Sequence, residues 1–76
     1  MEKVIEILED IKGNVDYAHE TSLVDDRILD SFSILTLVAE LEDEFDVEIS
    51  YNEIKPHNFN SAQGLWEMVQ RLSEED

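Results

Sequence analysis

The chain has 76 residues, so we expect a single domain over residues 1–76 with one small hydrophobic core. Its 20 acidic residues outnumber the five basic ones and give a formal net charge of −15. This charge argues against binding to nucleic acids or to an anionic membrane surface, and a basic protein partner is the natural complement. The absence of cysteine excludes disulfides, thiolate metal sites and cysteine nucleophiles.

The distribution of apolar residues argues against a membrane protein. No apolar run approaches the roughly 20 residues that a membrane-spanning helix needs. Residues 1–6 include acidic side chains where a signal peptide has a basic region and then an apolar stretch. We therefore expect a cytoplasmic protein that does not insert into membranes. The two glycines and one proline offer little turn chemistry for a β fold, so composition favours helices.

The first periodic segment predicts a helix from Glu2 to about Lys12. Its apolar residues fall on one stripe at about 100° per residue, and they are Val4, Ile7, Leu8 and Ile11. Gly13 and Asn14 are typical of a helix end. Residues 15–29 lose the period and predict a long loop, which we expect Leu23 and Ile28 to anchor.

The strongest helical pattern covers residues 30–45. Asp30 stands in the position of an N-cap, and the core-facing residues are Ile34, Leu37, Val38, Leu41 and Phe45. After the helix ends near residue 46 or 47, Ile49 is expected to point inward. Residues 50–54 predict a short helical turn, which Lys55 and Pro56 end.

The last predicted helix follows Asn60 and Ser61. Asn60 is interpreted as its N-cap with Gln63 at N3, a variant of the capping box. Its buried face comprises Ala62, Leu65, Met68, Val69 and Leu72, with Trp66 at the edge. Residues 73–76 are interpreted as a frayed acidic tail. The pattern predicts an all-α, four-helix bundle with three longer helices and one short helix, most simply antiparallel.

No combination of residues supports enzyme activity. His19 and His57 lie in predicted loops away from any pattern that marks a nucleophile or a metal site, so we expect ordinary surface histidines. Acidic residues spread around a helix are usually a solvated face. The sequence therefore predicts neither catalytic residues nor a metal site.

The helix over residues 30–45 has a second apolar line opposite its core face. Phe32, Leu35 and Ala39 are expected to project into solvent, and Glu42, Asp43 and Asp46 continue that line. The alternative is that Phe32 and Leu35 cover the edge of a small core. The functional interpretation is a docking strip, an apolar patch rimmed by acids that fits a groove with basic edges.

Ser31 stands at the first position of this helix, beside the docking strip. A serine there is most often a cap or a bystander. A phosphodiester on its hydroxyl, however, would be stabilised by the positive end of the helix dipole and by backbone N–H groups.

The segment Leu29-Asp30-Ser31-Phe32, with Leu35, residues 37–38 and the run 41–45 after it, resembles the phosphopantetheine attachment segment of acyl carrier proteins. Residues 21–26 resemble the loop that precedes this segment in the family, and residues 59–61 resemble the start of its last helix. The resemblance implies that a phosphopantetheinyl transferase attaches 4′-phosphopantetheine from coenzyme A to Ser31. It also implies a monomer that serves fatty acid, polyketide or nonribosomal peptide biosynthesis.

The resemblance assigns further roles by position. Asp30 would cap the helix and help the transferase recognise the site. The partner enzymes would include an acyl- or aminoacyl-loading ligase or synthase with a basic docking surface. The residues that would contact these enzymes are Asp30, Phe32, Leu35, Ala39, Glu42 and Asp43. Fatty-acid carriers commonly have acids where this chain has Ser33 and Thr36, so the motif is closer to D-alanyl carriers and stand-alone specialised carriers. An acyl carrier, an aminoacyl carrier and an unmodified acidic interaction module remain the alternatives.

Overall fold

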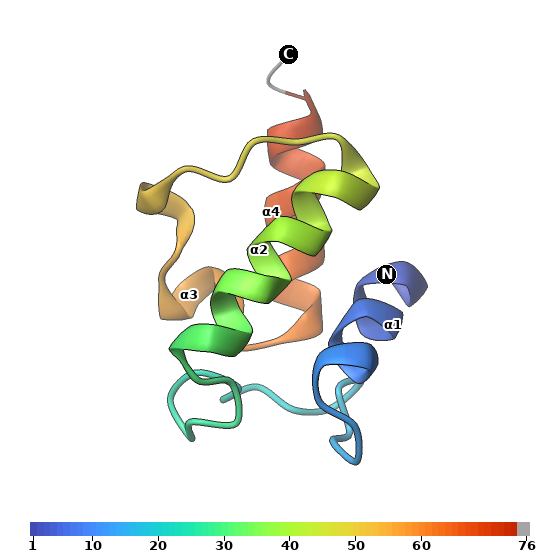
Figure 1. Ribbon diagram of the computed structural model, residues 1–76, viewed down its shortest axis with the longest axis vertical. Helices are drawn as coiled ribbons and strands as arrows, with labels where there is room; N and C mark the ends of the chain where they lie inside the picture. The colour runs from blue at the N-terminus through green and yellow to red at the C-terminus, as the bar shows by residue number, and fades with distance from the viewer. Residues whose placement is uncertain (75–76) are drawn as a thin grey trace.

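The computed structural model describes residues 1–74, and these residues are helical with no β-strand. Figure 1 shows three longer helices and two short segments between the second and the third of them. In chain order they are α1 (Glu2–Ile11), α2 (Ser31–Phe45), the 3₁₀ turn η1 (Tyr51–Glu53), α3 (Pro56–Phe59) and α4 (Ala62–Glu74). The predicted all-α bundle of three longer helices and one short helix is confirmed. No helix within residues 1–74 combines the length and the apolar character needed to cross a membrane.

The directions of the helices differ from the simple antiparallel prediction. In Figure 1, α1 runs opposite to both α2 and α4, whereas α2 and α4 run in the same direction. Residues 46–61 make this possible, because they lead the chain back from the end of α2 to the end of the molecule at which α2 begins. The prediction of an antiparallel bundle was therefore wrong for the pair α2 and α4.

One hydrophobic core joins the three longer helices. Its buried members include Leu8 from α1, Leu37 from α2 and Leu65 from α4, each of which has no exposed surface. The predicted apolar stripes of the three helices are confirmed, with Ile34, Val38, Phe45 and Leu72 packed against the core from partly buried positions. At one margin the rings of Phe45 and Trp66 lie 5.8 Å apart at an angle of 59°. This separation is typical of a stabilising tilted aromatic pair.

The long loop after α1 is held by buried side chains, as predicted, but not by both of the predicted ones. Leu23 has no exposed surface, whereas Ile28 is only partly buried against the core. Leu29 is the second buried anchor, and its backbone N–H donates to the Leu23 carbonyl. Tyr17 is also buried, and its hydroxyl donates to the Lys12 carbonyl.

The segment after α2 begins with a left-handed residue, Asp46, at φ 53°. Ile49 is buried and η1 follows it, so both predictions for this segment are confirmed. A second short helix was missed, since α3 begins at Pro56, which had been interpreted as a stop. Proline fits the first position of a helix, where its missing N–H has no intrahelical partner.

The start of α4 corrects the predicted cap. The Ser61 hydroxyl accepts the Gly64 N–H at 2.9 Å, which makes Ser61 the N-cap in place of Asn60. Gln63 bonds to Glu67 one turn later and completes no capping box. The helix extends to Glu74, so residues 73 and 74 are helical and not a frayed tail; residues 75–76 of that prediction lie outside the described residues.

Candidate functional site

Ser31 is the first residue of α2, and its side chain is exposed. Within residues 1–74 its hydroxyl has no hydrogen-bond partner. A reagent or an enzyme can therefore reach this oxygen without breaking an internal bond. The position also places a substituent of the hydroxyl at the positive end of a helix of 15 residues.

Asp30 organises the same helix end. Its Oδ1 accepts the backbone N–H of Ser33 at 2.8 Å, which confirms the predicted N-cap. This hydrogen bond, followed by one from the Ser33 hydroxyl, holds the pKa of Asp30 below its usual range. The residue before Ser31 is therefore a fixed anion at neutral pH.

The docking strip of α2 is exposed. Phe32 is 78% exposed and Leu35 is 65% exposed, and Ala39 on the same line is exposed as well. The alternative, in which Phe32 and Leu35 cover the edge of the core, does not agree with these values. Large apolar side chains this exposed on a small protein are characteristic of an interaction surface.

The acids that continue the docking strip differ in their surroundings. Asp43 and Asp46 are exposed. Glu42 is half-buried, and its Oε2 accepts the Ile49 backbone N–H at 2.8 Å across the chain reversal that follows α2. Glu42 therefore has a structural role that the helical pattern did not indicate, and Asp43 is the more accessible of the two predicted docking acids.

Tyr51 is an exposed aromatic residue that the sequence analysis did not single out. It lies in η1 and is 87% exposed. The available signal was its position directly after Ser50 in a short turn whose flanking residues Ile49 and Ile54 pack against the core. Of the four residues between them, Ser50, Tyr51 and Asn52 are exposed, whereas Glu53 is partly buried and bonds to Asn58 and Arg71.

The loop before Ser31 is held in place from the start of α4. The Leu23 N–H donates to the Asn60 carbonyl at 2.9 Å. The side-chain oxygen of Asn60 accepts the N–H groups of Val24 and Asp25 at 2.9 and 3.0 Å, and its amide group donates to the Asp25 carboxylate at 3.1 Å. Asn60 was interpreted as a helix cap, so this positioning role was missed. The sequence did contain a signal: Asn60 and Ser61 can both cap a helix, but only one of them can cap α4, so the other is available for different hydrogen bonds.

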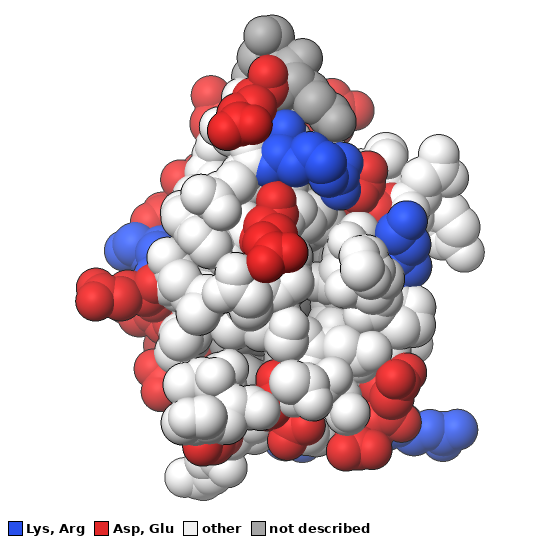
Figure 2. Space-filling view, turned by 180° about the vertical axis from the view of Figure 1, so that it is seen from behind, with Lys and Arg blue, Asp and Glu red and all other residues white. Residues whose placement is uncertain are grey.

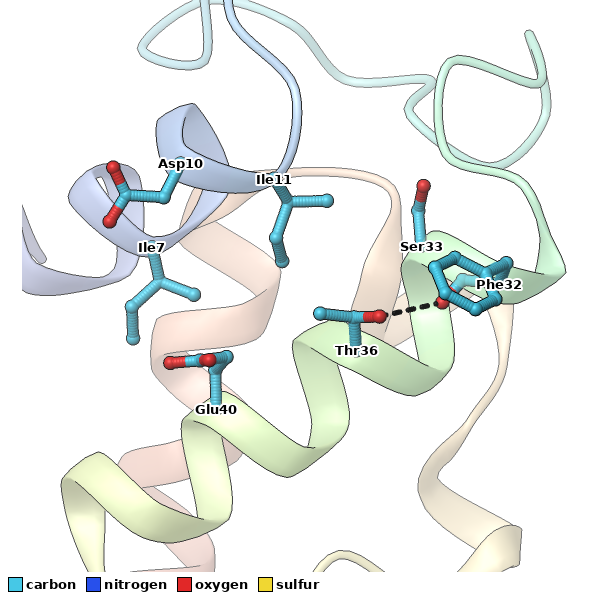
Figure 3. A pocket seen from close by; sticks show the side chains of 7 residues that line it. All are labelled: Ile7, Asp10, Ile11, Phe32, Ser33, Thr36 and Glu40. Atoms are coloured by element: carbon cyan, nitrogen blue, oxygen red, sulfur yellow. Dashed lines mark hydrogen bonds between the residues drawn. The ribbon is translucent and has the colours of Figure 1, made fainter.

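A groove of about 320 Å³ lies between α1 and α2. Figure 3 shows its lining, with Ile7, Asp10 and Ile11 on α1 opposite Phe32, Ser33, Thr36 and Glu40 on α2. The Thr36 hydroxyl donates to the Phe32 carbonyl at 3.1 Å, one turn back on α2. The groove begins with the two residues that follow Ser31 in the chain.

Acidic charge is greater on α1 and α2 than on α4. α1 and α2 contain four acidic residues each, whereas α4 contains two. Figure 2 shows the face opposite to that of Figure 1, where acidic side chains lie mainly toward the margins and uncharged ones cover much of the middle. Lys3 on α1 pairs with Glu44 on α2 at 3.2 Å, and this hydrogen bond raises the pKa of Lys3. The excess of acids would draw a basic partner toward α1 and α2.

The histidines and acids of the described chain form no metal centre. His19 is exposed beside Asp16, with Nδ1 and Oδ2 2.9 Å apart, and His57 is exposed at the start of α3. Residues 1–74 contain no group of three or more His, Asp or Glu side chains placed to hold a metal ion.

Comparison with known proteins finds relatives that match nearly the whole chain. A D-alanyl carrier protein of Streptococcus sanguinis (strain SK36) is 32% identical over 71 residues, which cover 92% of this chain and 90% of the relative. One from Lactococcus lactis subsp. cremoris (strain MG1363) is 29% identical over 77 residues, which cover 99% and 98%. Neither a family model nor a solved structure matches the chain. The fold places the segment Leu29-Asp30-Ser31-Phe32 at the start of α2. Together with this placement, the sequence identity over nearly the full length shows that the chain belongs to the D-alanyl carrier protein family.

Proposed function

We propose that this protein carries an aminoacyl group, with D-alanine as the first candidate, as a thioester on a 4′-phosphopantetheine arm attached to Ser31. One observation carries the proposal: an exposed, unbonded serine hydroxyl begins a long helix, beside two exposed apolar residues, in a chain whose relatives are named D-alanyl carrier proteins. The preference for an aminoacyl cargo over other acyl groups rests on those names and on the neutral residues Ser33 and Thr36.

The attachment is a phosphoryl transfer to Ser31. Its hydroxyl oxygen attacks the phosphorus of coenzyme A that bears the pantetheine, and the bond from that phosphorus to the adenosine 3′,5′-bisphosphate portion breaks. The hydroxyl proton leaves to a base of the transferase. This chain supplies an accessible oxygen and a helix N-terminus that favours the resulting phosphodiester anion. Ser31 is a substrate in this step and not a catalytic nucleophile.

The residues around Ser31 fit such an arm. The side chain is exposed, so the helix end has room for a substituent. The chain contains no cysteine, so it has no thiol of its own for a thioester. When bound, the arm supplies that thiol at its far end. Asp30, held by Ser33, keeps the helix end rigid while the hydroxyl is modified.

The partners of this proposal are a phosphopantetheinyl transferase and an amino-acid-activating ligase. Phe32, Leu35, Ala39 and Asp43 form the exposed surface on α2 that such enzymes would contact, and a basic rim on the enzyme would meet the acids of α1 and α2. Glu42 contributes to this surface from its half-buried position, and Asp30 adds a fixed charge next to the modified residue.

Modification of Ser31 is tested by treating the protein with a broad-specificity transferase and coenzyme A, followed by intact mass measurement and peptide mapping. The wild type should gain one phosphopantetheine on Ser31. Ser31→Ala should fold and gain none, and Ser33→Ala, the matched control two residues away, should still gain one. A wild-type protein that stays unmodified with several transferases, or an arm found on Ser33, would contradict the proposal.

A further inference from the structure

The loop before Ser31 contains a cation that the fold does not use. Arg27 is exposed and lies four residues before Ser31 in the chain. Within residues 1–74 its guanidinium group forms no ion pair and no hydrogen bond. Two acids directly precede it, but the Asp25 carboxylate accepts the amide group of Asn60 instead. The side chain of Arg27 is therefore available to contact another molecule.

The backbone of Arg27 is left-handed, with φ 58°. This conformation is unfavourable for residues with a Cβ atom, and glycine adopts it without that penalty. The other left-handed residues within 1–74 are Asn14 and Asp46, whose short polar side chains tolerate it better. The Arg27 N–H donates to the Val24 carbonyl at 3.0 Å, a turn that glycine would form equally well. The fold therefore gives no reason for an arginine here, and backbone strain near a functional site points to a role of the side chain.

Arg27 is also isolated by its charge. Between Lys12 and Lys55 it is the one basic residue of the sequence, in a stretch that contains Asp30, Asp43 and many other acids. A partner whose basic surface fits the docking strip would therefore meet a single positive charge in this loop. That charge repels a uniformly basic surface and favours one that has a carboxylate opposite it. Specific interfaces commonly combine attractive contacts with such a repulsive element.

Arg27 lies within the area that an enzyme acting on Ser31 would cover. Four residues span at most about 14 Å, so the Cα atoms of Arg27 and Ser31 are no farther apart than that. A standard protein interface covers about 800 Å² on each partner, the area of a circle about 16 Å in radius. Figure 1 shows the loop and the start of α2 at the same end of the molecule. Because Leu23 is buried and Asn60 bonds to two backbone N–H groups of the loop, Arg27 is presented from a defined backbone position.

We propose that Arg27 is the residue by which the amino-acid-activating ligase selects this carrier, through a carboxylate of the ligase that faces the guanidinium group. The inference rests on the proposed function, since it names the feature that one of the proposed partners recognises. Arginine suits this role because its planar group pairs with a carboxylate through two hydrogen bonds.

The two proposed partners differ in their need for such a feature. A transferase of broad specificity accepts carriers with different loops, so attachment of the arm needs only Ser31 and the docking strip. A dedicated ligase must distinguish this carrier from other acidic carriers. A lone arginine near the modified serine provides that difference as a charge at a fixed place.

The test separates attachment of the arm from loading. Wild type, Arg27→Gly and Arg27→Glu are first modified by a broad-specificity transferase with coenzyme A. They are then loaded with D-alanine by the D-alanine-activating ligase of the same organism, with ATP. Arg27→Gly suits the left-handed backbone, so it should melt at or above the wild-type temperature. It should also accept the arm at a rate similar to that of wild type.

Loading should distinguish the variants. Arg27→Gly should raise the KM of the ligase for the carrier by about two- to fivefold, the scale of an exposed ion pair, and leave kcat unchanged. Arg27→Glu should raise KM further. The control Lys3→Gln removes the same charge beside Glu44, which follows Ser31 by 13 residues on α2, or about 20 Å along the helix axis. It should load like wild type.

A reversed charge identifies the group on the partner. Ligase variants are made in which single Asp or Glu residues around the carrier-binding surface are changed to Lys. One of them should restore loading of Arg27→Glu and impair loading of wild type. A general effect of Arg27 on the fold or on net charge would not produce this exchange.

The outcomes separate this inference from the proposed function. The inference is overturned if both Arg27 variants load with the wild-type KM, if Lys3→Gln is impaired as much as Arg27→Gly, or if no ligase variant restores Arg27→Glu. In each of these cases Ser31 remains the attachment site. If the arm attaches but the ligase does not load wild type, the aminoacyl cargo and this inference are both wrong. If wild type accepts no arm, the proposed function fails together with the inference.

Discussion

The side-chain oxygen of Asn60 accepts the backbone N–H of Val24 at 2.9 Å, although 36 residues separate the two in the chain. The same oxygen accepts the N–H of Asp25, so one amide group satisfies two backbone donors of the loop that leads to Ser31. The position of the candidate modification site is thus set partly by the junction of α3 and α4. A residue far from Ser31 in sequence is therefore bonded to the loop that leads to it.

Replacing Asn60 with alanine should loosen this loop. The change leaves two backbone N–H groups without their acceptor. Because the Val24 bond is partly buried and the Asp25 bond is exposed, we expect a cost of about 1 kcal/mol. In a domain of this size each kcal/mol lowers the melting temperature by about 4–8 °C. Thermal unfolding followed by circular dichroism measures the effect, and hydrogen exchange should become faster at Val24 and Asp25.

The matched control is Gln63→Ala, which removes an amide side chain that bonds only to the exposed Glu67. It should stay within about 0.5 kcal/mol of wild type. An Asn60→Ala protein as stable as this control would show that the loop is held by its buried side chains alone.

Docking on the strip of α2 should depend on Leu35 and Asp43. Leu35→Asp should keep the helical content, because the residue is 65% exposed, and should slow loading by the cognate enzymes. Asp43→Lys should slow association by about two- to fivefold at low salt and reduce its dependence on salt. Loading rates measured over a series of salt concentrations provide the readout.

Glu74→Lys, with the same charge change on α4, serves as the control for Asp43→Lys and should load at close to the wild-type rate. Glu42→Lys is a poorer probe, because it also removes the acceptor of the Ile49 N–H and so alters the fold. If Leu35→Asp and Asp43→Lys both load like wild type, partners dock elsewhere.

The contact between Glu53 and Arg71 should make stability depend on pH. The Arg71 hydrogen bond, aided by Asn58, lowers the pKa of Glu53 in the folded state. A carboxyl group with a lowered folded pKa stabilises the protein above its unfolded pKa, near 4.5, and this contribution is lost as pH falls through the folded pKa. Glu53→Gln should therefore be less stable than wild type at pH 7, and the difference should shrink as the pH falls below 4.5 and vanish once it is below the lowered pKa of the folded state.

The difference between the two proteins is the diagnostic quantity, because acid also relieves repulsion among the other carboxylates of this chain. Melting temperatures from pH 3 to pH 7 for wild type and Glu53→Gln measure it. If the melting temperatures of the two proteins differ by the same amount at every pH, the ionisation of Glu53 does not contribute to stability, which would contradict the prediction.

Repulsion among the acids of α2 should make the fold sensitive to salt. Residues 28–54 contain no basic side chain, and Glu40 with Glu44 is a like-charge pair four residues apart on α2. Glu42 and Asp46 have the same spacing in sequence, but α2 ends at Phe45 and the backbone of Asp46 is left-handed, so they are not a helical pair. A like-charge pair at this spacing on a helix destabilises it by about 0.2–0.5 kcal/mol. The melting temperature at neutral pH should rise with NaCl, and at much lower concentrations of calcium or magnesium, with loose and non-stoichiometric binding. A melting curve unmoved by both salts would show that these acids do not interact.

The sequence was sufficient to predict the elements that depend on short-range chemistry. The apolar stripes of α1, α2 and α4 repeat at helical spacing, and Asp30 is three residues from the N–H that it accepts. The exposure of Phe32 and Leu35 followed from the same helical geometry. Each of these features depends only on residues within about one helical turn of each other in the sequence.

The features that sequence analysis missed depend on contacts between distant segments. Asn60 bonds to residues 35 and 36 positions earlier, and Glu42 bonds across the chain reversal to Ile49. The parallel direction of α2 and α4 follows from the path of residues 46–61, where Pro56 begins a helix and does not end one. The groove between α1 and α2 exists only once those two helices pack together.

The central claim, an aminoacyl cargo carried through Ser31, is tested most directly by a charging assay read by intact mass. Protein carrying the arm is incubated with ATP, D-alanine and the D-alanine-activating ligase that serves one of the relatives. Parallel reactions replace D-alanine by L-alanine, or use a short fatty acid together with its own ligase. The account predicts that D-alanine adds once, that hydroxylamine removes it as expected for a thioester, and that Ser31→Ala adds nothing. Protein that takes the fatty acid but never an amino acid would contradict it.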